Sequence, residues 1–231
     1  MFNNIILRGI REGDQNGGPH DLSKILNSSL IACNGFNKNN LISKYLKWWK
    51  SKAIDTGPVF AGVFTHISNG IEPEKAVKKV DISLNGNTAG CGPAHRVSPL
   101  AGFMNIPTDR LISIAKEEAK ITHFHPDAGN GSAIVVMLCR YLLEGKTWEE
   151  TKLLVSKNNL LKKPWQCINN AEIRPDGYIF NVLCSALHFL DNENSLENAK
   201  KFAGAANYCP VIVGLISKIR ISMKLKLPSS K

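Results

Sequence analysis

The sequence predicts an all-α protein, a compact orthogonal bundle of many helices. In segment after segment apolar residues recur three and four positions apart, and no series of alternating apolar and polar residues predicts a set of strands. The chain has 231 residues, of which 43% are hydrophobic, and this is enough to bury one core. We therefore expect a single domain over residues 1–231, with a frayed tail over about 222–231.

The first half of the chain contains the clearest helical pattern. Residues 21–33 place Leu22, Ile25, Leu26 and Leu30 on one face and end near the pair Asn34-Gly35. The same criterion predicts helices over 40–51, 56–68 and 72–80, the last with Pro73 at its start. Residues 85–99 are rich in glycine and proline, so we expect a loop there.

In the second half, a buried helix is expected at the centre of the bundle. Residues 131–144 are almost entirely apolar, which is typical of a helix covered on all sides. Helices are also predicted over 108–121, capped by Thr108, and over 148–157, capped by Thr147. The less regular segment 161–175 is followed by predicted helices over 180–190, 195–202 and 211–221.

The chain carries a formal net charge of +10, which raises the question of nucleic-acid binding. Its lysines are spread over the polar faces of the predicted helices, and no nucleic-acid-binding motif is present, so a solvated basic surface explains the charge better. The positive field still favours an anionic ligand. No apolar run is long enough to cross a membrane, and the first residues lack a signal-peptide layout. We expect an intracellular, cytoplasmic protein.

The six cysteines show no paired C-x-x-C spacing. Neither a zinc site nor a disulfide framework is therefore predicted, and we expect free thiols.

Two loop sequences are more informative than the helices. The first is Gly90-Cys91-Gly92-Pro93-Ala94-His95-Arg96-Val97-Ser98-Pro99-Leu100, and the second is Thr122-His123-Phe124-His125-Pro126-Asp127-Ala128. Together they resemble two inner loops of the ADP-ribosylglycohydrolase family. Further similar motifs occur in the family's order from about residue 13 to residue 220, including Ala53-Ile54-Asp55-Thr56-Gly57 and Gly145-Lys146-Thr147-Trp148-Glu149-Glu150. The resemblance implies that family's all-α fold and a cleft for ADP-ribose or a related ribosyl nucleotide, either free or carried on an ADP-ribosylated protein.

The resemblance also implies two magnesium ions, and here the sequence departs from the family. Members hold the metals with aspartate-rich loops near both ends of the chain, because a hard cation prefers oxygen ligands. This chain has Gly17-Gly18-Pro19-His20 at the first loop, and Ala205 and Asn207 at the two aspartate positions of the second. We therefore expect the usual binuclear magnesium site to be missing, or to be replaced by a weaker site around Asp14, Asp55 and Asn207.

Three residues are candidates for catalysis. Asp55 is the strongest, since a carboxylate near an anomeric carbon stabilises a cationic transition state, although it could instead cap the following helix. His123 could serve as a general acid or base with a pKa near neutrality. Asp14 lies in the rebuilt loop Gly13-Asp14-Gln15-Asn16-Gly17-Gly18-Pro19, which is equally well explained as a turn.

The candidate ligand-binding residues come from the same loops. Arg96 could bind a diphosphate or form a structural ion pair with Asp55 or Asp127. His125 could bind a ligand, act as a general acid or base, or anchor its loop by hydrogen bonds to the backbone. Cys209 could be a thiolate activated by a helix N-terminus, or part of a structural turn. The full set is Asn16, Gly17, Gly18, Gly90, Gly92, His95, Arg96, His125, Asn207, Tyr208 and Cys209.

Two functions stay open at this point. The retained polar loops favour an enzyme that hydrolyses a glycosidic bond to ribose. The missing carboxylates favour a protein that has lost catalysis and binds a nucleotide or serves as a crystallin-like structural protein.

Overall fold

The computed structural model describes residues 2–192, 195–204 and 207–225, and it is built from α-helices. The helices are α1 (Phe2–Gly13), α2 (Gly18–Cys33), α3 (Lys38–Lys52), α4 (Pro58–Ser68), α5 (Pro73–Ser83), α6 (Gly92–Arg96), α7 (Pro99–Gly102), the 3₁₀ helix η1 (Thr108–Arg110), α8 (Leu111–Ala119), α9 (Pro126–Leu143), α10 (Trp148–Lys157), α11 (Lys162–Asn169), α12 (Ile179–Asp191), α13 (Ser195–Ala203) and α14 (Cys209–Lys224). In these segments the β-type pairing is one isolated antiparallel bridge, between Gly90 and Tyr178. The all-α prediction is confirmed.

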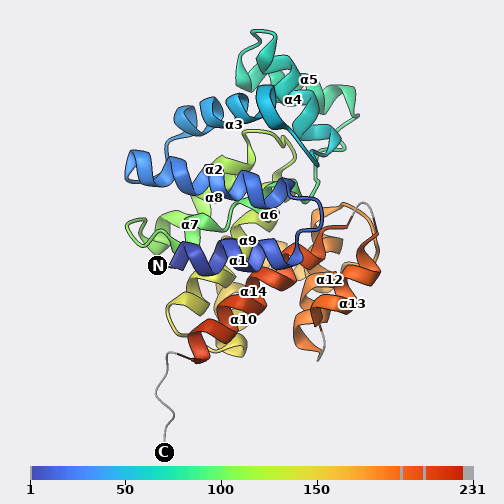
Figure 1. Ribbon diagram of the computed structural model, residues 1–231. Helices are drawn as coiled ribbons and strands as arrows, with labels where there is room; N and C mark the ends of the chain where they lie inside the picture. Colours follow the sequence, from blue (N-terminus) through green and yellow to red (C-terminus); the bar gives the residue numbers. More distant parts are fainter. Residues whose placement is uncertain (1, 193–194, 205–206, 226–231) are drawn as a thin grey trace, which may run out of the picture.

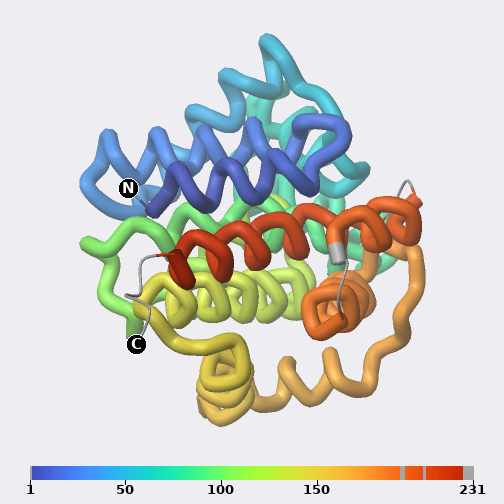
Figure 2. Tube along the Cα trace, turned by 60° about the horizontal axis from the view of Figure 1, so that its bottom comes forward, coloured from blue at the N-terminus to red at the C-terminus, as the bar shows by residue number. Residues whose placement is uncertain are grey.

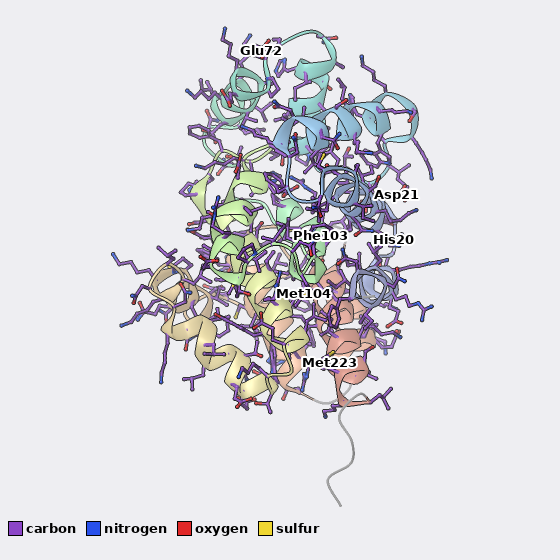
Figure 3. The ribbon with its side chains drawn as sticks, turned by 90° about the vertical axis from the view of Figure 1, so that its left-hand side faces the viewer. His20, Asp21, Glu72, Phe103, Met104 and Met223 are labelled. Carbon is purple, nitrogen blue, oxygen red and sulfur yellow. The ribbon has the colours of Figure 1, made fainter. Side chains whose placement is uncertain are left out.

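Helix α9 is the centre of the bundle, as its apolar sequence predicts. It is 18 residues long, is buried along almost its whole length, and contacts α6, α7, α8, α10, α11, α12 and α14. Helices α3, α4 and α5 lie at one end of the molecule and α10 lies toward the other (Figure 1). In Figure 2, α1, α14 and α9 run side by side as successive layers. The side view separates Glu72, before α5, from Met223 near the end of α14 (Figure 3).

Several elements differ from the sequence prediction. Helices α1, α6, α7 and α11 were not predicted, and residues 222–224 continue α14 where a frayed tail was expected. Residues 226–231 of that tail lie outside the described residues. Thr147 does cap α10, in a capping box with Glu150. Thr108, by contrast, donates its hydroxyl to Glu144 Oε1 and caps no helix.

Helices α1 and α14 approach closely because glycines line their contact. A Cβ atom placed on Gly13 would lie 2.0 Å from the carbonyl oxygen of Pro210, and one on Gly214 would lie 2.6 Å from the carbonyl oxygen of Gly9. The amide of residue 13 therefore packs directly against the start of α14. This contact fixes the position of the segment just before α14, which includes Tyr208.

A buried ion pair joins α6 to α8. Arg96 Nε donates to Glu118 Oε1 at 2.7 Å, and the two side chains are 1% and 0% exposed. The same oxygen accepts the Tyr45 hydroxyl of α3 at 3.1 Å. The guanidinium also lies over the rings of Tyr45 and Phe60, at 5.4 and 5.6 Å from their centres. One charged contact thus ties together helices from four parts of the chain.

None of the helices in the described ranges has both the length and the apolar character that crossing a membrane requires.

The first prediction concerns this ion pair. Glu118→Gln keeps the shape of the side chain but leaves the Arg96 charge buried without its counter-ion, so unfolding should need about 3–5 kcal/mol less free energy. Chemical denaturation measures this. Glu197→Gln is the control, because Glu197 pairs with Lys200 at an exposed position and should change stability by less than about 0.5 kcal/mol. Equal effects of the two substitutions would contradict the prediction.

The second prediction concerns the close helix contact. Gly13→Ala must push α1 away from α14 and should destabilise the protein by about 1–3 kcal/mol. Gly129→Ala is the matched control, since a Cβ there meets its nearest neighbour at an ordinary 3.4 Å. In that helical position alanine should be neutral or stabilising by up to about 1 kcal/mol. Thermal unfolding of both variants tests the difference.

Candidate functional site

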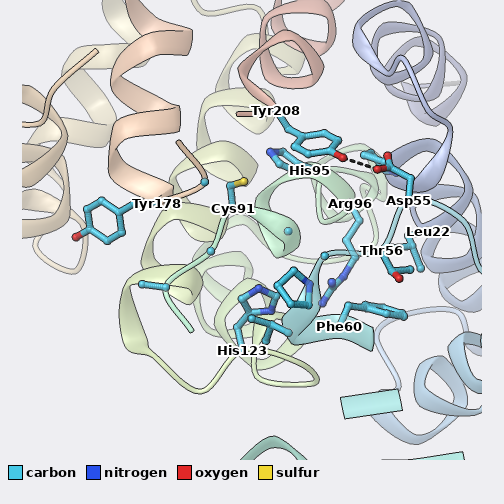
Figure 4. A pocket seen from close by; sticks show the side chains of 18 of the residues that line it. Leu22, Asp55, Thr56, Phe60, Cys91, His95, Arg96, His123, Tyr178 and Tyr208 are labelled. Carbon is cyan, nitrogen blue, oxygen red and sulfur yellow. Dashed lines mark hydrogen bonds between the residues drawn. The ribbon is translucent and has the colours of Figure 1, made fainter. Parts of the chain in front are cut away.

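A cleft of about 660 Å³ opens between the start of α4, the 87–96 segment and the loops that precede α12 and α14. This volume lies within the range of about 300–1,000 Å³ that is typical of small-molecule sites. Figure 4 shows the labelled side chains that surround it. Its walls are formed by Pro19, Leu22, Asp55, Thr56, Gly57, Pro58, Val59, Phe60, Asn87, Ala89, Gly90, Cys91, Gly92, His95, Arg96, His123, Gly177, Tyr178 and Tyr208.

Asp55 contributes the only carboxylate among these lining residues. Its backbone is in the left-handed region with a φ of 49°, an uncommon conformation outside glycine that is often found at functional sites. Its Oδ1 accepts a short hydrogen bond from the hydroxyl of Tyr208. No hydrogen bond forms to Oδ2, which is buried.

Burial raises the pKa of Asp55 above its ordinary value. The hydrogen bond from Tyr208 acts in the opposite direction, and so do the nearby Gly18 N–H and the Asn16 side chain. The Tyr208 hydroxyl, in turn, has its pKa raised to about 12 by burial and by Asp55, so it remains a donor at neutral pH. Asp55 is therefore a partly desolvated carboxylate held by a neutral phenol.

Asp14 organises the N-terminal loop that precedes α2. Asp14 Oδ1 accepts the backbone N–H groups of Asn16 and Gly17, at 3.1 and 2.8 Å, and its Oδ2 accepts the N–H of His20 at 2.8 Å. Asp14 thus shapes the turn and satisfies a free N–H group at the start of α2. It does not line the cleft, so a catalytic role for Asp14 receives no support from its position.

The glycines of this loop serve the protein backbone. Gly17 has a φ of 97° and caps α2. A Cβ on Gly18 would lie 2.5 Å from the carbonyl oxygen of Asp55. Neither glycine is among the lining residues, and their predicted contact with a ligand stays a prediction.

His95 lies against the ring of Tyr208, with 5.1 Å between ring centres. It is 3% exposed, and its Nε2 is buried without a hydrogen-bond partner. Burial, with a contribution from Arg96, lowers the pKa of His95 to about 3. The side chain is therefore neutral at physiological pH.

Arg96 reaches the cleft wall, but its charge is already neutralised. The structural alternative of the sequence analysis fits the geometry, with a different partner: Arg96 pairs with Glu118 and not with Asp55 or Asp127. Glu118 was not singled out because no local pattern distinguishes it from the other acidic residues of its helix. Only the packing of α8 against α6 brings the two side chains together.

His123 lies across the cleft from Asp55 in Figure 4. Its Nδ1 is 2.7 Å from the hydroxyl of Thr122, and its ring faces Gly90 and Gly92, where an added Cβ would lie 3.3 Å from Nε2 and Cε1, respectively. Burial, together with Arg96 and His95, lowers the pKa of His123 well below its ordinary value. The expected pKa near neutrality is therefore wrong.

The remaining candidates lie outside the lining. His125 anchors α9, because its Nδ1 accepts the N–H of Asp127 at 3.2 Å. Asn207 accepts the N–H of Cys209 at 2.9 Å and donates to the carbonyl oxygen of Arg174 at 2.8 Å, which stabilises the turn before α14. Burial raises the pKa of the Cys209 thiol to about 12, so the expected activation of this thiol is wrong.

The start of α4 also contributes to the cleft. Gly57 is the N-cap and Pro58 follows it, and no side chain caps this end. The N–H groups of Val59 and Phe60 therefore lack a side-chain acceptor, and such helix ends attract anions. These residues were not among the predicted site residues, although the Gly-Pro pair before an apolar run marks the helix start.

The residues at the two predicted metal loops do not fit a magnesium pair. Gly17 and Gly18 offer no side-chain ligand, both oxygens of Asp14 accept backbone N–H groups, and Asn207 is engaged in its turn. Across the described ranges, no three side chains of His, Cys, Asp or Glu gather as a set that could hold a metal ion. Ala205 lies outside the described residues.

Comparisons with known proteins identify a family and a similar fold. A family model described as ADP-ribosylglycohydrolase matches residues 20–208. The fold is similar to a solved structure titled "ADP-ribosylglycohydrolase-related protein complex", with a TM-score of 0.68 and 20% sequence identity over 87% of this chain and 70% of that one. No curated protein matches the sequence. Since the family model spans most of the chain and ends at the cleft residue Tyr208, the protein belongs to the ADP-ribosylglycohydrolase family.

Proposed function

We propose that this protein hydrolyses an N- or O-glycosidic bond to ribose in ADP-ribose-type substrates, with Asp55 as the carboxylate that acts at the anomeric carbon. The observation that carries the proposal is the position of Asp55, a partly desolvated carboxylate held by Tyr208 at the wall of the 660 Å³ cleft. Family membership supports hydrolysis in general, since ADP-ribosylglycohydrolases are as a rule hydrolytic.

The proposed reaction uses the one carboxylate among the residues that line the cleft. As the bond from the ribose C1 to its leaving group breaks, positive charge develops on the ring, and the Asp55 carboxylate stabilises it. Water adds its oxygen to C1 and passes a proton to Asp55, while the leaving group departs with its bonding electrons and takes up a proton from solvent. Asp55 then returns its proton to solvent.

The substrate class follows from the start of α4, where the N-cap Gly57 lines the cleft two residues after Asp55 in the chain. The uncapped start of α4 suits a phosphate oxygen, because its free N–H groups and its dipole both favour negative charge. Arg96 is committed to Glu118, so these backbone groups would provide the recognition. We propose ADP-ribose or a related ribosyl nucleotide, free or attached to a protein, as the ligand.

The third prediction tests Asp55. Asp55→Asn keeps the volume and removes the charge, so release of ADP-ribose from an ADP-ribosylated peptide should fall by at least about 100-fold. Folding should not suffer: a raised pKa means that the ionised carboxylate opposes folding at neutral pH, and the melting temperature should stay equal or rise slightly. Unfolding of the variant would make Asp55 a structural residue. Wild-type protein that binds ADP-ribose without any turnover would instead be a binding protein.

The fourth prediction concerns pH. If ionised Asp55 is the active form, activity rises with pH along a limb set by its raised pKa. The Tyr208 hydrogen bond lowers that pKa, so Tyr208→Phe should move the limb to higher pH. Tyr178→Phe is the control, because the Tyr178 hydroxyl donates to Asp127 and not to Asp55. A limb that stays in place in Tyr208→Phe would contradict the assignment.

The fifth prediction concerns metal. Since the loops lack paired carboxylates, isothermal titration should detect no two tightly bound magnesium ions per chain, and millimolar magnesium should leave the melting temperature unchanged. Two tight sites would overturn the expectation.

A further inference from the structure

The neighbours of His123 indicate which of its two ring nitrogens carries the proton. Thr122 is fully buried, and its hydroxyl oxygen has two polar contacts: Arg96 Nη2 at 2.9 Å and His123 Nδ1 at 2.7 Å. Across the described residues the hydroxyl makes no other hydrogen bond. The two contacts must therefore account for both its donor and its acceptor capacity.

The first of these contacts has only one possible direction. A guanidinium has N–H donors and no acceptor, so Arg96 donates and the Thr122 oxygen accepts. The Glu118 carboxylate holds Arg96 in the charged state and in this position. The hydroxyl hydrogen of Thr122 then has one acceptor within reach, which is His123 Nδ1.

The opposite arrangement is unfavourable. If Nδ1 carried the proton, it would donate to Thr122, and the hydroxyl hydrogen would be left buried without an acceptor. Such an unsatisfied donor costs about 1–3 kcal/mol, which corresponds to a population ratio of about 5 to 150. The network therefore selects the imidazole that is protonated at Nε2.

Nε2 is the atom of His123 that is available to a ligand. It has no hydrogen bond to the described residues. Unlike the Nε2 of His95, it is not fully buried without a partner. The ring lines the cleft, and the absence of side chains at Gly90 and Gly92 leaves room beside it.

We propose that the chain Glu118–Arg96–Thr122 fixes His123 as a neutral Nε2–H tautomer, which donates a hydrogen bond to an oxygen of the bound ligand. Thr122 is then a positioning residue and His123 a specificity-determining one. Only the identity of the ligand rests on the proposed function; the tautomer does not. The cleft would present a donor at His123 and an acceptor at Asp55, a pair that suits a sugar with its hydroxyl and ring oxygens.

The tautomer is tested without any ligand. Two-dimensional NMR of ¹⁵N-histidine-labelled protein at neutral pH distinguishes a protonated from an unprotonated ring nitrogen, and the spectrum of His123→Gln assigns the His123 signals among the six histidines. We expect a protonated Nε2 and an unprotonated Nδ1. A proton on Nδ1, or on both nitrogens, would overturn the proposal.

Two variants of Thr122 test the cause. Thr122→Ser keeps the hydroxyl and should give the wild-type spectrum. Thr122→Val keeps the shape and removes the hydroxyl, so His123 should show a mixture of both tautomers. Circular dichroism and thermal unfolding verify that both variants fold. A wild-type spectrum in folded Thr122→Val would show that Thr122 does not select the tautomer, and would overturn its role as a positioning residue.

Recognition is tested with ADP-ribose as the probe. His123→Gln retains an N–H donor near the position of Nε2 and should bind ADP-ribose within about threefold of wild type, whereas His123→Phe should lose about three- to tenfold in affinity. Equal affinities of wild type and His123→Phe would overturn the role in recognition. Failure of the wild type to bind ADP-ribose would overturn the proposed function, while the NMR result would still decide the tautomer.

Discussion

The buried ion pair between Arg96 and Glu118 is the contact on which the rest of the site depends. Burying two charges is costly unless each finds its partner, and here the partner comes from another helix, with a phenol and two aromatic rings around it. The pair fixes α6 against α8 and α3. It therefore also fixes His95, which precedes Arg96 in the chain, and His123, which is linked to Arg96 through the Thr122 hydroxyl.

Because of this ion pair, the charge inside the cleft differs from the net charge of the chain. The chain carries a net charge of +10, yet the cationic lining residue Arg96 is neutralised by Glu118. Both histidines of the cleft are neutral, because burial and the positive charge of Arg96 disfavour a second cation there. A ligand thus meets one carboxylate, neutral donors and the free N–H groups of a helix end. Basic side chains on the outer surface can attract an anion but are not placed to bind it.

The two loops that were predicted to correspond to the family's metal-binding loops stabilise helix starts in this chain. Asp14 and Asn207 use their side-chain oxygens to satisfy the backbone N–H groups at the starts of α2 and α14. Those helix starts, in turn, place Asp55 and Tyr208 at the cleft wall, where the two side chains share a hydrogen bond. The chemistry of the site is thereby concentrated on a single carboxylate with a protein partner.

The sequence alone was sufficient for the helical architecture, the central position of α9 and the membership of the family. Those features depend on local periodicity and on short sequence motifs. The cap at Thr147 could be predicted for the same reason, because its partner is three residues away. Helix α1 was missed, although Phe2, Ile6 and Ile10 recur at helical spacing. Its close contact with α14 could not be predicted, because Gly13 and Gly214 are far apart in the sequence.

Tertiary structure alone decided the partners of the charged and titratable groups. Glu118 as the partner of Arg96, Tyr208 as the donor to Asp55, and the low pKa of His123 all arise between segments that are distant in sequence. The same holds for Cys209: the sequence left a reactive thiolate and a structural turn as alternatives, and burial, which raises the pKa of the thiol, decides for the structural turn. Periodicity determines which residues are buried, but the charge state of a buried group depends on which side chains packing places beside it.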